Sequence, residues 1–154
     1  MTYESAYNKF SYLIFIVLSF PLGALIYIYL TEPEESKPCL IFGVLLMSLF
    51  LFLLHAYKNT RYTINKDFLT YQMSFFHGKI DIQKIRKIEY NNSIFVNSIL
   101  KIGWSHKGLI ITYNNYDDIF LAPKNKEDFV IQILKINPRI KIENPANQEI
   151  KNEI

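Results

Sequence analysis

Apolar residues are concentrated in two long stretches near the start of the chain. Residues 10–30 (FSYLIFIVLSFPLGALIYIYL) and 39–57 (CLIFGVLLMSLFLFLLHAY) contain no Asp, Glu, Lys or Arg. A helix rises about 1.5 Å per residue, so each stretch can cross the roughly 30 Å hydrocarbon core of a bilayer. The segment between them, TEPEESKP, is polar and contains two prolines, which end helices. This pattern predicts a transmembrane hairpin over residues 1–57, with spans at 10–30 and 39–57.

The charges around these stretches predict the orientation of the hairpin. Lys58, Arg61 and Lys66 follow the second stretch, and Lys9 precedes the first, whereas the connecting segment has one Lys and three Glu. Because Lys and Arg are retained on the cytoplasmic side, we expect a multi-pass protein of the inner or plasma membrane with both termini in the cytoplasm. A cleaved signal peptide is an alternative for the first stretch, although its apolar run is longer than the usual run of about 7 to 15 residues.

Several residues of the hairpin have more than one interpretation. Ser19 and Gly23 have the small-xxx-small spacing, which fits a kink packed against the second span or a contact with a second copy. Cys39 has no partner cysteine in the chain and is either a small interfacial residue or an acylation site. Tyrosines near the ends of the spans fit anchoring at the membrane interface. They are Tyr3, Tyr7, Tyr12, Tyr27, Tyr29 and Tyr57.

The pattern after residue 58 changes to short runs of β-branched and aromatic residues separated by turn signals, which is typical of antiparallel β-structure. The expected elements are a hairpin of strands 61–64 and 68–73, a turn at His77-Gly78, a strand at 80–90 interrupted by a bulge or one helical turn, and a hairpin of strands 109–113 and 119–122.

One amphipathic helix follows these strands. Asn125 is placed to cap it, and Phe129, Val130, Ile133 and Leu134 fall on one face before Asn137-Pro138 ends the helix. Such a helix suits the role of covering a small sheet or barrel. We therefore expect one domain at 58–142 and a disordered tail at 143–154.

Composition and motifs restrict the chemistry of the protein. Half of the 154 residues are hydrophobic and 20% are charged, which excludes a disordered chain. The sequence contains no nucleophile elbow, zinc-protease motif, phosphate-binding glycine loop or cysteine pair. We expect no enzymatic activity, no cofactor and no metal. His77, His106 and Asp81 would have to converge in a pocket to change that expectation.

The basic residues are the better functional lead. The chain from residue 58 onward carries 15 Lys and Arg and 10 Asp and Glu, a net charge of +5 that an anionic leaflet would attract. The candidate surface for a lipid or protein partner comprises Lys84, Arg86, Lys87, Lys101, Trp104 and Lys107. Alternatively, these cations solvate an edge strand and Trp104 packs in the core. The modest charge argues against nucleic acid as a partner.

The chain contains, in order, two spans, the segments RYTI, FLTY and GKIDIQKIRKIEY, and the run from GLIITY to INPRI. In this order of segments it resembles the bacterial PH-like domain proteins of the YyaB type. The resemblance covers residues 60–140 and is most specific at 119–140. It implies a PH-like, partly open β-barrel capped by the C-terminal helix. That family includes the sublancin bacteriocin immunity protein, so the resemblance implies a membrane-anchored binding module with a peptide toxin as one possible partner. An accessory subunit of another membrane protein is the alternative.

Overall fold

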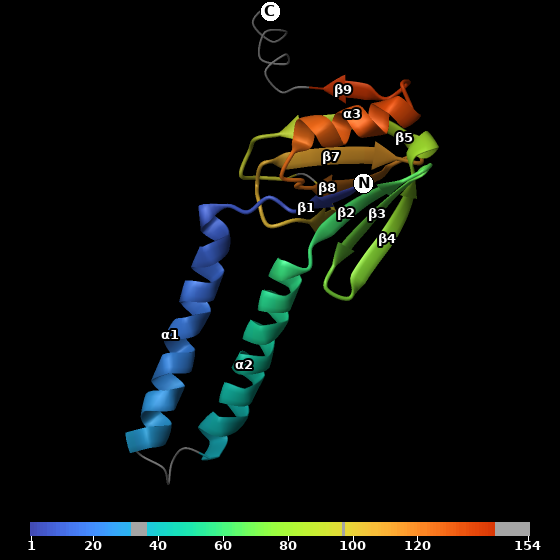
Figure 1. Cartoon of the computed structure of the whole chain (residues 1–154). Helices are drawn as coiled ribbons and strands as arrows, with labels where there is room; N and C mark the ends of the chain where they lie inside the picture. Colours follow the sequence, from blue (N-terminus) through green and yellow to red (C-terminus); the bar gives the residue numbers. More distant parts are fainter. Residues whose placement is uncertain (32–36, 97, 144–154) are drawn as a thin grey trace, which may run out of the picture. The chain divides into compact units, whose positions relative to one another are not determined.

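The computed structural model describes residues 1–31, 37–96 and 98–143. The chain forms two units: a helical hairpin, Lys9–Lys58, and a β domain that combines Met1–Asn8 with the chain from Asn59 onward (Figure 1). The elements in chain order are β1 (Thr2–Glu4), α1 (Lys9–Thr31), α2 (Lys37–Lys58), β2 (Arg61–Asn65), β3 (Phe68–Met73), β4 (Phe76–Asp81), the 3-10 turn η1 (Ile82–Lys84), β5 (Ile85–Asn91), β6 (Leu100–Ile102), β7 (Gly108–Tyr113), β8 (Asp117–Leu121), α3 (Lys126–Ile136) and β9 (Lys141–Glu143).

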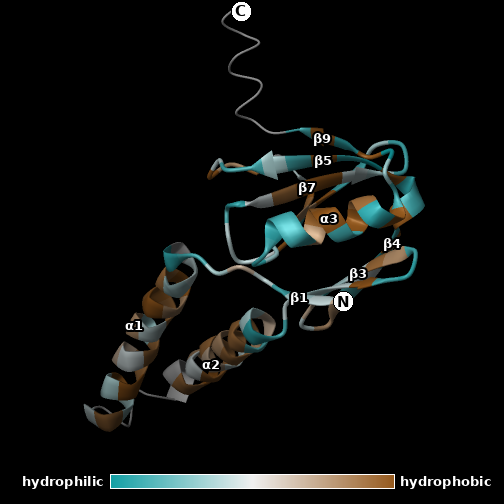
Figure 2. Cartoon of the chain, turned by 45° about the horizontal axis from the view of Figure 1, so that its top comes forward, coloured by the Kyte–Doolittle hydropathy of each residue, from teal (hydrophilic) through white to brown (hydrophobic). Residues whose placement is uncertain are grey.

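The two apolar helices lie where the hydrophobic pattern predicts them. The ring of Phe15 on α1 meets the rings of Phe50 and Tyr57 on α2 edge-on, with centroids 5.8 and 5.4 Å apart. Hydrophobic residues cover most of both helices (Figure 2). By length and composition, each helix is able to cross a membrane. Most of the connecting segment, 32–36, lies outside the described residues.

The small residues of the hairpin differ in what lies near them. A Cβ added at Gly43 of α2 would lie 3.8 Å from Leu25 of α1, whereas one added at Gly23 would meet no atom within 4 Å. Gly43 is therefore the glycine at which the helices approach each other. The interpretation that Gly23 packs against the second span is wrong, because Ser19 and Gly23 are exposed.

The first sheet is antiparallel, with the strand order β1-β2-β3-β4. The hairpin of β2 and β3 confirms the prediction, but the predicted turn at His77-Gly78 is wrong. The chain turns at Ser74, which has a φ of 55°, and Phe75, while Gly78 lies within β4 opposite Tyr71. A Cβ at Gly78 would lie 2.2 Å from the Tyr71 ring, so this glycine serves close packing across the strands.

The N-terminal residues belong to this first sheet. Thr2–Glu4 pairs with β2, and the hydroxyl of Tyr3 donates a hydrogen bond of 2.6 Å to Asp128. The predicted hairpin region of 1–57 is therefore corrected, because residues 1–8 belong to the β domain. Tyr3 packs in that domain and does not anchor the hairpin. A three-residue strand shows no periodicity, and its pairing depends on β2, which begins 57 residues after Glu4.

The second sheet has the strand order β6-β8-β7-β5-β9. The pairs β6 with β8 and β5 with β9 are parallel, and the other neighbours are antiparallel. The predicted antiparallel barrel is corrected in two respects, because the described strands include parallel pairs and form two sheets that do not close. The interruption predicted within 80–90 is confirmed as a 3-10 turn, Ile82–Lys84, and a register shift between Ile85 and Lys87.

The helix α3 covers the core as the amphipathic pattern predicts. The side chain of Asn125 accepts a hydrogen bond from the backbone N–H of Asp128, which satisfies a free donor at the first turn. Phe129, Val130 and Ile133 are buried. The ring of Phe129 lies edge-on to Tyr3 and Tyr62, with centroids 5.1 and 6.2 Å apart.

The buried hydroxyl of Tyr62 joins the two sheets. It donates a 2.7 Å hydrogen bond to the carbonyl of Ile102 and accepts one of 3.2 Å from the N–H of Ala122. Burial raises the pKa of Tyr62 to about 12, and its hydrogen bonds with the Ser5 hydroxyl and the N–H of Ala122 partly oppose that rise. Tyr62 therefore remains protonated and holds β2 of the first sheet against the ends of β6 and β8.

The chain does not leave the domain at residue 142. Lys141–Glu143 forms β9, parallel to β5, and the carboxylate of Glu143 pairs with Lys87 at 3.2 Å. The predicted tail thus begins at least one residue later than expected, and its remainder, 144–154, lies outside the described residues. A polar three-residue strand has no hydrophobic signal of its own, because its position depends on the partner strand.

Candidate functional site

The β domain has two ends that can be told apart by chain connectivity. The proximal end contains Asn8 and Asn59, which immediately precede α1 and follow α2. The distal end contains the turn between β2 and β3, the η1 turn and the turn between β7 and β8. Backbone hydrogen bonds join these three turns: Ile82 donates to Asp67 at 2.8 Å, and Asn114 donates to Lys84 at 3.1 Å.

At the proximal end, both connections to the hairpin are fastened to one loop. Tyr7 forms a parallel bridge with Trp104, and the side-chain amide of Asn8 donates a hydrogen bond to Nδ1 of His106. The indole N–H of Trp104 donates to the hydroxyl of Thr60 at 3.0 Å. We call these five residues the junction. Trp104 thus has a structural contact within the domain, which agrees with the packing interpretation of this residue.

At the distal end, two of the predicted basic residues come together. Lys84 and Arg86 line a shallow hollow with Gln83, Asn114 and Asn115. The Arg86 guanidinium donates to the side-chain oxygen of Asn115 at 3.1 Å, which orients it in the hollow. Both cations are exposed, and no carboxylate is among the lining residues described. The hollow therefore combines two positive charges with amide donors, a set suited to a carboxylate or phosphate.

Like Asp81 beside Gln83, Asp117 lies two residues along the chain from a lining residue of this hollow. One of its carboxylate oxygens accepts a 2.7 Å hydrogen bond from the Asn114 amide. Asn114 itself has a φ of 51°, in the left-handed region that asparagine tolerates in tight turns. Asp117 therefore shapes the turn that carries the two asparagines and partly offsets the positive charge of Lys84 and Arg86.

The third predicted cation of this segment, Lys87, is already paired. Its ammonium lies 2.7 Å from Glu89 and 3.2 Å from Glu143. The hydrogen bond that Lys87 donates to Glu89 is the main reason that the pKa of Lys87 is raised, and the hydrogen bond that it donates to Glu143 lowers the pKa of Glu143. This cluster has a net negative charge and holds β9 on β5, so Lys87 is not part of a basic surface.

Lys101 and Lys107 do not join Lys84 and Arg86. The register places Asn91 opposite Gly108 and Ile85 opposite Tyr113, so Lys107 and Lys84 lie at opposite ends of β5 and β7. Seven residues of β5 separate the two ends by roughly 20 Å. Lys101 lies on β6, with its ammonium 5.3 Å from the Phe120 ring. The six predicted residues therefore do not form one continuous surface.

His77 and Asp81, two of the three residues that would have to converge to indicate a metal or catalytic site, are also separated. His77 pairs in register with Gln72 near the proximal end, while Asp81 pairs with Phe68 near the distal end and caps η1 through the N–H of Gln83. Among the described residues, no group of three His, Cys, Asp or Glu side chains is arranged to hold a metal ion.

Sequence reasoning missed one exposed feature of the proximal end. Phe75 and Phe76, at the turn between β3 and β4, are 75% and 64% exposed. The register places this turn beside Arg61, the first residue of β2. The pair of adjacent aromatic residues in SFFHG could have indicated this feature. The turn was predicted at His77-Gly78 instead, so Phe75 and Phe76 were not expected at a turn.

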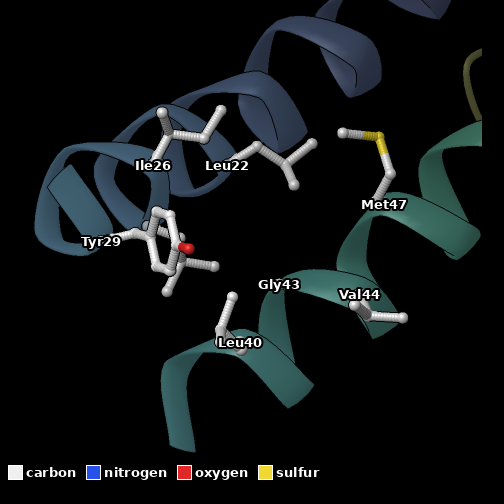
Figure 3. Close-up of a pocket in the computed structure, with 8 residues that line it drawn as sticks. Leu22, Ile26, Tyr29, Leu40, Gly43, Val44 and Met47 are labelled. Carbon is white, nitrogen blue, oxygen red and sulfur yellow. The ribbon is translucent and has the colours of Figure 1, made fainter. Parts of the chain in front are cut away.

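The hairpin has an apolar pocket of its own between α1 and α2 (Figure 3). Figure 3 shows Leu22 and Tyr29 of α1 facing Leu40 and Met47 of α2, and Ile26 of α1 also lines the pocket. The pocket is completed by Leu25, Gly43 and Val44. Its lining is apolar apart from the Tyr29 hydroxyl and includes no charged residue, so it suits an acyl chain or an apolar helix.

The fold and these two ends define a small domain of two facing sheets capped by a helix, with a polar hollow at the end opposite its connections to the helices. A family model described as the bacterial PH domain matches residues 60–137, and the chain belongs to this family. No curated protein and no solved structure matches the chain. The match begins at Thr60, in the junction, and ends at Asn137, which closes α3.

Proposed function

We propose that the protein is a non-enzymatic binding module, anchored in the membrane by α1 and α2, that presents its distal hollow to an acidic group of a protein partner in the cytoplasm. The observation that carries the proposal is the pairing of β1 with β2, since these strands flank the hairpin in sequence and are neighbours in one sheet. Membership of the bacterial PH domain family supports a binding role.

The pairing of β1 with β2 supports two crossings of the membrane. The segments before α1 and after α2 belong to one folded unit, so they lie on one side of the bilayer. A hairpin satisfies this condition, because α1 and α2 then cross in opposite directions. The same pairing argues against a cleaved signal peptide, because cleavage after α1 would remove β1 from its sheet.

The distribution of charge supports a cytoplasmic domain. Lys58 and Arg61 follow the second span directly, while Glu32, Glu34 and Glu35 lie between the spans. On the rule that cytoplasmic flanks carry Lys and Arg, the β domain faces the cytoplasm. A reporter enzyme fused after residue 154, compared with the same reporter inserted at residue 34, tests this orientation: activity of the first reporter outside the cytoplasm would contradict it.

The position of the hollow favours a protein partner over lipid headgroups. Lys84 and Arg86 lie at the end of the domain opposite the connections to the hairpin, roughly 20 Å away along β5. The attraction of a charged leaflet decays over a Debye length of about 8 to 10 Å at physiological salt. We therefore favour a protein partner that meets these cations on the cytoplasmic side; if that partner is itself held at the membrane, confinement raises the effective concentration of both proteins.

Two versions of this function make different predictions. If the module confers immunity to a bacteriocin, as the YyaB-type resemblance implies, deletion of its gene sensitises the strain to a peptide toxin. If it is an accessory subunit of a membrane complex, its abundance falls when the gene of its partner is deleted. Measuring toxin sensitivity and protein abundance in the same strains separates the two versions.

The hollow itself is tested by charge removal in the full-length protein. We expect Lys84→Ala with Arg86→Ala to abolish the recovery of a stoichiometric partner when the protein is purified from native membranes in mild detergent. Lys101→Ala with Lys107→Ala is the matched control, since it removes the same charge away from the hollow. Equal recovery with both double variants, or equal loss, would contradict the assignment of the hollow as the partner site.

A further inference from the structure

The exposed aromatic turn between β3 and β4 points to a second function of the β domain. Arg61 pairs with Gln72, and Gln72 pairs with His77, so Phe75 and Phe76 lie at the end of the sheet where β2 begins. Only residues 59 and 60 separate Arg61 from the last residue of α2. An extended residue spans at most about 3.6 Å, so this end of β2 lies within roughly 11 Å of the helix terminus.

The chemistry of this turn suits the interfacial region of a bilayer. Phe76 is 64% exposed, and the chain contains no Asp or Glu between residues 68 and 80. The flanking side chains are His77 and Arg61, with Glu4 opposite Arg61 on β1. An exposed phenylalanine is unfavourable in water but stable at the boundary of headgroups and acyl chains, where nearby cations meet anionic lipid.

A second apolar loop starts from the same end of the domain. Ile94 and Phe95, just after β5, are 70% and 87% exposed. The side-chain amide of Asn91 donates to the carbonyls of Ser93 and His106, each at 2.9 Å, which fastens the start of this loop to the junction. Two exposed apolar loops thus start at the end of the domain from which both connections to the helices leave.

We propose that the turn at Phe75 and Phe76, with the loop at Ile94 and Phe95, inserts into the cytoplasmic leaflet and docks the proximal end of the domain on the lipid surface. This inference rests on the proposed membrane anchoring, because the hairpin brings the loops to the bilayer. Docking sets the direction of the distal hollow: with the proximal end held on the lipid, Lys84 and Arg86 point away from the membrane.

Depth-dependent quenching tests the docking in the full-length protein reconstituted into vesicles of phosphatidylcholine and phosphatidylglycerol. Phe76→Trp adds a reporter to the proposed docking turn. Tyr116→Trp adds one to the distal turn, where Tyr116 is 95% exposed, and both variants keep the native Trp104 as a common background. Lipids brominated on their acyl chains should reduce the added fluorescence of Phe76→Trp by about half and leave that of Tyr116→Trp nearly unchanged.

The same vesicles separate the failure of this inference from the failure of the anchoring. If an alkaline wash extracts the protein, the hairpin is not inserted and the proposed function fails. If the protein is retained but Phe76→Trp is not quenched, the turn faces water or another protein and the docking is wrong. Equal quenching of both variants would also overturn it, since the domain would then have no proximal side on the membrane.

Discussion

The substitution Phe129→Ala tests whether α3 is the packed cover of the β domain. Phe129 is completely buried, and its ring contacts Tyr3 of β1 and Tyr62 of β2 edge-on. Replacing a buried phenylalanine with alanine costs about 3 to 5 kcal/mol, because apolar contacts are lost and a cavity remains. Each aromatic pair contributes about 0.5 to 1.5 kcal/mol beyond its buried area, so we expect a loss in the upper part of that range.

The chain provides its own probe for this measurement. Trp104 is its single tryptophan and lies in the junction of the β domain, so its fluorescence reports the unfolding of that domain in the full-length protein. Guanidinium titration in detergent micelles gives the free energy of unfolding from the midpoint and slope. Small domains are stable by about 5 to 15 kcal/mol, so the expected loss should move the midpoint far toward zero denaturant.

Ile131→Ala is the matched control for this experiment. Ile131 lies on the same helix but is 51% exposed, so its truncation removes little buried surface. A midpoint of Phe129→Ala as close to the wild-type value as that of Ile131→Ala would refute the packing of α3 on the two sheets. Full loss of folding in Phe129→Ala with a normal Ile131→Ala would support it.

Three further substitutions test other contacts by the same titration. Tyr62→Phe leaves buried backbone groups of the second sheet without their partner, and we expect a loss of about 1 to 3 kcal/mol; an unchanged midpoint would mean that this hydroxyl does not join the sheets. Gly108→Ala should destabilise the domain by about 1 to 3 kcal/mol, because its Cβ would lie 2.4 Å from the carbonyl oxygen of Leu121. Tyr3→Phe removes the hydrogen bond that holds the pKa of Asp128 below its ordinary value of 3.8. This hydrogen bond stabilises the folded state above pH 3.8, and the stabilisation is lost as the pH falls through the lowered pKa. The loss in free energy of unfolding caused by Tyr3→Phe should therefore be full at pH 7 and become smaller below about pH 4. A loss independent of pH would contradict its assignment to the hydrogen bond with Asp128.

The parts of the fold that were predictable have strong local signals. The two helices of the hairpin follow from charge-free stretches, and α3 follows from an Asn cap and the periodicity of Phe129, Val130 and Ile133. The interruption of the strand before Tyr90 was visible in the spacing of its isoleucines. These features depend on residues within one or two turns of each other, so neighbouring positions carry the information.

The candidate surface was less accessible to sequence reasoning. Lys84, Arg86 and Lys87 are close in the chain, yet Lys87 forms ion pairs with Glu89 and Glu143 and is therefore not part of the distal hollow. Trp104 was a candidate contact, and the structure shows its indole bonded to Thr60. The ion pair of Lys87 with Glu89, two residues away, is within reach of a local pattern, whereas the pairing with Glu143 and the contact of Trp104 with Thr60 join residues 56 and 44 positions apart, which no local pattern contains.

The sequence by itself determined the identity of the elements: two apolar helices, short strands and one amphipathic helix, because hydrophobic periodicity and capping act locally. Only the tertiary structure decided their association. In the folded chain Thr2–Glu4 pairs with β2, and β6 and β9 pair in parallel with their neighbours. The strands form two open sheets instead of one barrel. Strand pairing is a long-range choice set by backbone hydrogen bonds and shared burial, and the same pairing separated the proximal junction from the distal hollow.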